Sequence, residues 1–170
     1  MTRSILADAF DHHVWATLVV LDLLAPLSDE QLATTVPGTY GTILDTARHL
    51  VGSDRWYLFV QTDGAVDAIA EEEMSVAQLR EAMAPDAASW AGVLAANHDP
   101  DDDKVLHRDD GSEAHATWGV RLAQALDHGT DHRSQICTAL TTIGIQPPEI
   151  DVWAWALTVG KHRVTGEPAA

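Results

Sequence analysis

Apolar residues recur every three or four positions along several stretches of the chain, and the longest such stretch covers residues 117–142. Its repeating positions are Trp118, Leu122, Ala125, Gly129, His132, Ile136, Leu140 and Ile143. This spacing places them on one face of an α-helix. The pattern therefore predicts a long helix over residues 117–142 that ends before Gly144, because glycine commonly follows the last turn of a helix.

Similar repeats predict three earlier long helices. They cover residues 4–25, 42–61 and 75–97. The first helix should stop at Pro26, because proline cannot continue a helix, and Thr42 is a residue type that caps helix N-termini. Pro85 lies inside the third helix, so we expect a kink or an interruption there.

Two smaller elements complete the expected fold. Residues 104–116 predict a short hairpin that turns at Gly111, and residues 151–162 predict a short terminal helix. Four long helices with one long connection are typical of a four-helix bundle. We therefore predict an all-α fold: a four-helix bundle with a long crossover, a small hairpin before its fourth helix and a short terminal helix. The length fits one domain over residues 1–170.

The amino-acid composition argues against several kinds of binding partner. The chain has 26 acidic and 10 basic side chains, a net charge of −16, which disfavours binding to nucleic acid. No apolar run approaches the roughly 20 residues of a membrane span, so we expect no membrane association, and the first residues do not resemble a signal peptide. A lone cysteine, Cys137, leaves no internal disulfide. We expect a cytoplasmic protein.

Three histidines form the main candidate site. His128 and His132 are four residues apart, so their imidazoles lie one turn apart on the same helix face. His49 belongs to a face of small and polar residues on the second helix, a composition that leaves space beside it. Three imidazoles that leave one coordination position of the metal open to exchange are typical of a catalytic site. The alternative is that the histidine pair binds no metal. Imidazoles accept zinc, nickel, copper and iron, so the spacing does not choose the metal.

Other side chains are candidates around that site. Asp45 and Asp131 could accept hydrogen bonds from the imidazoles, or be solvated carboxylates. His13 lies on the inward stripe of the first helix, as a pocket residue or a hydrogen-bonded core histidine. Trp56 shares the face of His49 and is a candidate for the cavity wall. We interpret Arg133 and Gln135 as bundle or dimer-surface residues, and the acidic run at residues 71–73 as solvated.

The ordered set of motifs resembles the DinB/YfiT-like family of metalloproteins, over nearly the whole chain. The motifs are Phe10-Asp11-His12-His13-Val14-Trp15-Ala16, Tyr40-Gly41-Thr42-Ile43-Leu44, His49-Leu50, Asp54-Arg55-Trp56-Tyr57-Leu58 and His132-Arg133-Ser134-Gln135-Ile136. The resemblance implies a divalent metal, zinc or nickel, held by His49, His128 and His132, and a homodimer. Some relatives use mycothiol or bacillithiol as a thiol cosubstrate. Where some of these thiol-dependent relatives have a glutamate ligand, this chain has a histidine.

Three functions are consistent with these observations. The first is a metal-dependent transferase that activates a low-molecular-weight thiol, of the mycothiol or bacillithiol type, for attack on an electrophilic small-molecule substrate. Cys137 is poorly placed for chemistry, so the sulfur would arrive with the cosubstrate. The second is a metal-dependent hydrolase that uses metal-bound hydroxide, although no carboxylate stands out in the sequence as its general base. The third is a non-catalytic protein that binds a metal or a small ligand.

Overall fold

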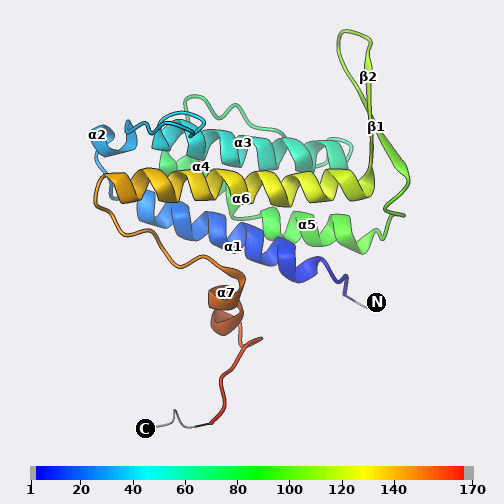
Figure 1. Ribbon diagram of the computed structural model, residues 1–170. Helices are drawn as coiled ribbons and strands as arrows, with labels where there is room; N and C mark the ends of the chain where they lie inside the picture. Colours follow the sequence, from blue (N-terminus) through cyan, green and yellow to red (C-terminus); the bar gives the residue numbers. More distant parts are fainter. Residues whose placement is uncertain (1–2, 167–170) are drawn as a thin grey trace.

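The computed structural model describes residues 3–166 and consists mostly of helices (Figure 1). The helices are α1 (Ala7–Leu24), α2 (Asp29–Leu32), α3 (Ile43–Gln61), α4 (Val76–Met83), α5 (Asp86–Ala95), α6 (Trp118–Thr142) and α7 (Val152–Thr158). Strands β1 (Asp103–His107) and β2 (Glu113–Thr117) lie between α5 and α6. In Figure 1, α3, α6 and α1 run alongside one another, and the short helix α7 near the C-terminus contacts α1.

The helix boundaries follow the capping residues of the sequence. At the start of α3, the Thr42 hydroxyl accepts a hydrogen bond from the backbone N–H of Asp45 at 3.0 Å, and the Asp45 carboxylate accepts the Thr42 N–H at 3.4 Å. This reciprocal pair satisfies two N–H groups that the helix itself leaves unpaired. The same arrangement joins Ser75 and Gln78 at the start of α4. The expected interruption at Pro85 is confirmed, because α4 ends before it and α5 begins after it.

The predicted hairpin is also confirmed. Strands β1 and β2 pair antiparallel, from Asp103 opposite Thr117 to His107 opposite Glu113. The fold is therefore not strictly all-α, and that part of the prediction is wrong. The Arg121 guanidinium of α6 donates to the carbonyls of Lys104 and Ala114, so it fixes both strands to the helix that follows them.

The core lies between α1, α3, α4, α5 and α6. Its largest buried side chains include Phe10 of α1, Leu50 of α3 and Trp90 of α5. The rings of Phe10 and Trp90 pack 4.5 Å apart, which brings α5 against α1. Helix α6 contacts both α3 and α1, and α4 also contacts α3 and α1. Among residues 3–166, no helix is long and apolar enough to cross a membrane.

Candidate metal centre

The structure brings His49 of α3 together with His128 and His132 of α6. One ring nitrogen from each histidine can be chosen so that all lie within 4.8 Å of one another. The Nε2 atoms of His49 and His128 are 3.1 Å apart. Two imidazole nitrogens bound to one tetrahedral zinc ion at about 2.0–2.1 Å would lie about 3.3 Å apart. The donor set, and the spacing of this pair, therefore fit a single divalent ion.

In two of the three rings, the Nδ1 atom faces a polar partner outside the cluster. The Nε2 atom of each ring then points toward the other histidines. His132 Nδ1 lies 3.2 Å from Gln135 Oε1, and His49 Nδ1 lies 3.5 Å from the Ser53 hydroxyl. An amide oxygen can only accept, so His132 carries its proton on Nδ1 when this bond forms. Its Nε2 then has a free lone pair, as a metal ligand requires.

Gln135 contacts a candidate ligand, whereas the sequence interpretation gave it a role on the bundle or dimer surface. Its Oε1 also accepts the backbone N–H of Tyr40 at 2.8 Å, and its Nε2 donates to Asp131 at 2.8 Å. Asp131, a predicted partner of an imidazole, thus reaches His132 only through Gln135. The sequence does contain a sign of this contact: Gln135 is three residues after the candidate ligand His132, so the two side chains lie on the same face of the helix.

Two tyrosines flank the histidines. The Tyr40 ring stacks on His49 with centroids 4.0 Å apart and planes 2° from parallel, and it meets His132 edge-on at 5.7 Å. The Tyr57 ring meets His128 edge-on at 5.6 Å. Tyr40 is 58% exposed, so one wall of the centre borders solvent. Trp56, predicted for this wall, instead stacks on Phe59.

The surroundings favour the neutral form of two of the imidazoles, those of His49 and His128. Burial, together with the nearby His132 and His49, lowers the pKa of His128 to about 4. Burial and the neighbouring His132 also lower the pKa of His49, although Glu71 partly opposes this change. Neutral imidazoles offer lone pairs at neutral pH, so a metal ion would displace few protons when it binds.

A carboxylate lies near the centre on the loop that follows α3. A Cβ added to Gly52 would meet the Glu71 carboxylate at 2.3–2.6 Å, so the side chain of Glu71 rests directly on the glycine. Gly52 is three residues after His49 and shares its helix face. Glu71 is only partly exposed and acts electrostatically on His49. It therefore differs from the solvated acidic residue that the sequence suggested.

Asp45 does not contact the histidines. Its carboxylate accepts hydrogen bonds from Thr42 in the cap of α3, and it lies 3.6 Å from Arg48. The helix N-terminus also favours negative charge at this position. Asp45 thus has a structural role at the start of the helix that carries His49, one turn away from the imidazole.

His13 belongs to a buried polar network and is not one of the clustered histidines. Its Nε2 lies 2.8 Å from Asp54, whose second oxygen accepts the Trp90 indole N–H at 3.2 Å. Arg133 approaches His13 Nδ1 at 3.2 Å and donates to Thr17 at 3.1 Å. The network joins α1, α3, α5 and α6 through satisfied polar groups, which favours one packing arrangement of these helices.

A second buried acid lies beside this network. Asp86 has no exposed surface and forms an ion pair with Arg55 at 2.9 Å. Burial and the nearby Asp54 carboxylate raise the pKa of Asp86 to about 7, in spite of Arg55. Two carboxylates held close together at low solvent exposure cannot both ionise easily. Asp86 therefore holds its proton more readily than an exposed aspartate does.

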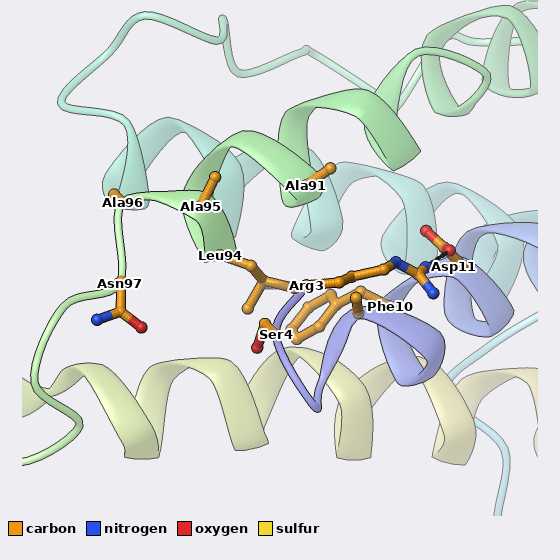
Figure 2. A pocket seen from close by; sticks show the side chains of 10 residues that line it. Arg3, Ser4, Phe10, Asp11, Ala91, Leu94, Ala95, Ala96 and Asn97 are labelled. Carbon is orange, nitrogen blue, oxygen red and sulfur yellow. Dashed lines mark hydrogen bonds and ion pairs between the residues drawn. The ribbon is translucent and has the colours of Figure 1, made fainter. Parts of the chain in front are cut away.

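A cavity of about 580 Å³ lies between α1 and α5 (Figure 2). Phe10 and Leu94 contribute apolar side chains, and Ala91 and Ala95 project from α5 above them. Arg3 extends across the opening and forms an ion pair with Asp11. None of the candidate metal ligands lines this cavity. We therefore do not associate it with metal chemistry.

Taken together, the helical scaffold and the partly exposed tri-histidine cluster define a candidate metalloprotein. The family model described as the DinB family matches residues 1–161 of the chain. The protein therefore belongs to the DinB family. A search of curated proteins finds no match.

Proposed function

We propose that this DinB-family protein is a metal-dependent transferase that uses a low-molecular-weight thiol, of the mycothiol or bacillithiol type, on an electrophilic substrate. His49, His128 and His132 would hold the divalent ion, for which zinc and nickel are the first choices. The observation that carries the proposal is the convergence of one nitrogen from each imidazole within 4.8 Å, on partly exposed helices.

The chain's own residues would position the ligands. Gln135 and Ser53 face the outer nitrogens of His132 and His49. Tyr40 and Tyr57 flank the imidazoles and restrict the approach of a ligand. A bound divalent ion would supply the positive charge that favours the thiolate form of a thiol beside it.

The sulfur nucleophile would come from the cosubstrate. Cys137 lies on α6 beyond the histidines and lines a different cavity, with His12 and Ile150. Burial raises the pKa of the Cys137 thiol, which disfavours its reactive thiolate form. This supports a transferase that needs no nucleophilic side chain of its own.

The test is turnover of a chromogenic electrophile, 1-chloro-2,4-dinitrobenzene, by zinc-loaded or nickel-loaded protein with mycothiol or bacillithiol. We expect turnover that requires both metal and thiol and falls at least about 100-fold in His49→Ala. His107→Ala is the matched control, because His107 is exposed on the hairpin and should retain full activity. Equal turnover in wild type and His49→Ala would reject the proposal.

The position of Glu71 supports a second candidate, a metal-dependent hydrolase. Its carboxylate rests on Gly52, on the helix face of His49, where a general base could take a proton from water. The test is hydrolysis of p-nitrophenyl acetate without thiol, compared between wild type and Glu71→Gln. A thiol-independent rate that falls about 100-fold or more in Glu71→Gln would favour the hydrolase over the transferase.

We also propose a four-helix bundle and a homodimer. In the bundle, α1, α3 and α6 would each form one helix, and α4 with α5 would form the other; such bundles hold metals between facing helices. On α7, Trp153 is 67% exposed whereas Trp155 is buried, so Trp153 is the better interface candidate. Light scattering of wild type and Trp153→Ala tests the dimer, and a monomeric wild type would reject it.

A further inference from the structure

Another cavity lies between α1, α6 and the segment that leads into α7, and its volume is about 550 Å³. Its wall is mostly apolar, with contributions from Ala9 of α1, Leu126 and Cys137 of α6, and Ile150 and Val152 beyond them. None of the candidate metal ligands lines it. Small-molecule sites in proteins usually have volumes of about 300–1,000 Å³, so the cavity is large enough for a small organic ligand.

The side chain of Arg133 is the unusual feature of this cavity, because it is charged and only 3% exposed. Among residues 3–166, its hydrogen bonds reach only neutral groups: Nη1 donates to His13 Nδ1 and to the Thr17 hydroxyl, and Nη2 donates to the Thr130 hydroxyl. Arginine cannot accept, so His13 carries its proton on Nε2, toward Asp54. A neutral imidazole thus separates Arg133 from the Asp54 carboxylate, whereas buried charges are usually paired directly.

One edge of the Arg133 guanidinium faces the cavity. Its Nε–H donates to no group among residues 3–166. In the described chain, the fully shielded side-chain atoms without a partner are Gln61 Oε1 and Asp86 Oδ2, so the Arg133 Nε atom is accessible. Thr130, which accepts from the neighbouring Nη2, lines the cavity as Arg133 does. The edge formed by Nε and Nη2 therefore presents a free donor to the cavity.

This combination selects the chemistry of the ligand. Nε, together with the second proton of Nη2, can hold the two oxygens of a carboxylate, and a neutral ligand would leave the buried charge without a counter-ion. The Asp151 carboxylate also lines the cavity, although it accepts the Ala154 N–H in the cap of α7. A singly charged anion therefore fits better than a doubly charged phosphate. The apolar wall favours an apolar body behind the charged group.

We propose that this cavity binds a monocarboxylate with an apolar body, of the medium-chain fatty acid type, with its carboxylate on Arg133. The site is separate from the candidate metal centre, and the proposal stands whether or not the histidines hold a metal. The net charge of −16 repels anions from the protein as a whole. Affinity for the carboxylate therefore comes from the enclosed guanidinium and the apolar wall, and both parts of the ligand are required.

The first experiment uses metal-free full-length protein, because a carboxylate could also bind a metal ion at the histidines. Cys137 is the only cysteine of the chain and lines the cavity, so its alkylation by iodoacetamide reports whether the cavity is occupied. We expect octanoate to slow this reaction at least tenfold at saturation. Calorimetry should give at least tenfold weaker binding for 1-octanol, which lacks the charge, and for acetate, which lacks the apolar body.

The second experiment changes the site, with folding monitored by circular dichroism. Arg133→Lys keeps the charge but has no planar pair of donors, so octanoate should bind at least tenfold more weakly. Ala9→Leu fills the cavity from α1 and leaves Arg133 unchanged, and it should weaken octanoate binding by a similar factor. Ala88→Leu is the matched control, because Ala88 is exposed on α5 and should leave binding as in wild type.

Three results would overturn the proposal. The first is no binding of octanoate, and the second is equal affinity for octanoate and 1-octanol, which would mean that Arg133 recognises no carboxylate. The third is octanoate binding that leaves Cys137 reactive and is unchanged in Ala9→Leu, because the ligand would then lie elsewhere. If Arg133→Lys unfolds, the comparison of probes on wild type and the Ala9→Leu variant still decide the question.

Discussion

We expect Gly129→Ala to lower the stability of the protein, although replacing a glycine within a helix by alanine ordinarily raises it. Gly129 follows His128 on α6, and the ring of His13 from α1 lies directly against it. A Cβ added at this position would lie 2.2 Å from His13 Cε1 and 2.9 Å from Arg133 Nη1. Carbon atoms in contact are about 3.5–4.0 Å apart, so the imidazole would have to move by more than about 1 Å.

Such a movement would disrupt the buried network. The 2.8 Å contact between His13 and Asp54 would be lost, and the unpaired buried polar groups together with the strained packing cost about 3–5 kcal/mol. The better helix propensity of alanine returns about 1 kcal/mol. The net expectation is a loss of about 2–4 kcal/mol, or roughly 5–15 °C in melting temperature for a protein of this size.

Urea denaturation, followed by circular dichroism, measures this loss directly. Gly92→Ala is the matched control, because a Cβ at Gly92 of α5 meets nothing within 4 Å. That variant should be stabilised by up to about 1 kcal/mol. If Gly129→Ala is as stable as Gly92→Ala, then His13 does not pack as closely against α6 as described here.

Two further predictions concern charge and ligand orientation. Since the pKa of Asp86 is raised from 3.8 to about 7, the folded state binds more protons than the unfolded state in this window, and stability should fall as pH rises through it. Asp86→Asn should flatten this dependence in urea titrations at pH 5 and pH 8, and an unchanged slope would contradict the assignment. Gln135→Ala should weaken zinc binding about 10–100-fold in a competitive chelator titration, because it removes the partner of His132 Nδ1; unchanged affinity would deny Gln135 that role.

Much of the helical framework was predictable, because local signals and packing agree there. Helix α6 was expected over residues 117–142 and runs Trp118–Thr142, with the Thr117 side chain as its cap. Pro85 interrupts a helix for a purely local reason, its missing N–H group. The first helix begins later than expected, at Ala7, and helix ends are the least certain part of any periodic pattern.

The candidate ligands were predictable for a similar reason. Helix geometry alone puts His128 and His132 on one face, and the small residues near His49 indicated space on α3. The sequence interpretation left open whether Asp45 contacts His49. In the structure, Asp45 instead pairs with Thr42 in the cap of α3.

The surroundings of the centre depend on loops and on distant contacts. Tyr40 reaches His49 from the loop before α3, where its backbone is held by Gln135, 95 residues away. Glu71 reaches the same helix from the connection between α3 and α4. No periodic pattern specifies where such loops cross a helix, so neither residue could be assigned from the sequence.

X-ray absorption at the zinc edge of zinc-loaded protein tests the central claim most directly. One zinc ion per chain should show three imidazole nitrogens at about 2.0–2.1 Å, together with one or more exchangeable ligands. His132→Ala should lose one imidazole contribution or fail to retain the metal. A wild-type spectrum with fewer than three imidazoles, or one that does not change in His132→Ala, would contradict a centre built from His49, His128 and His132.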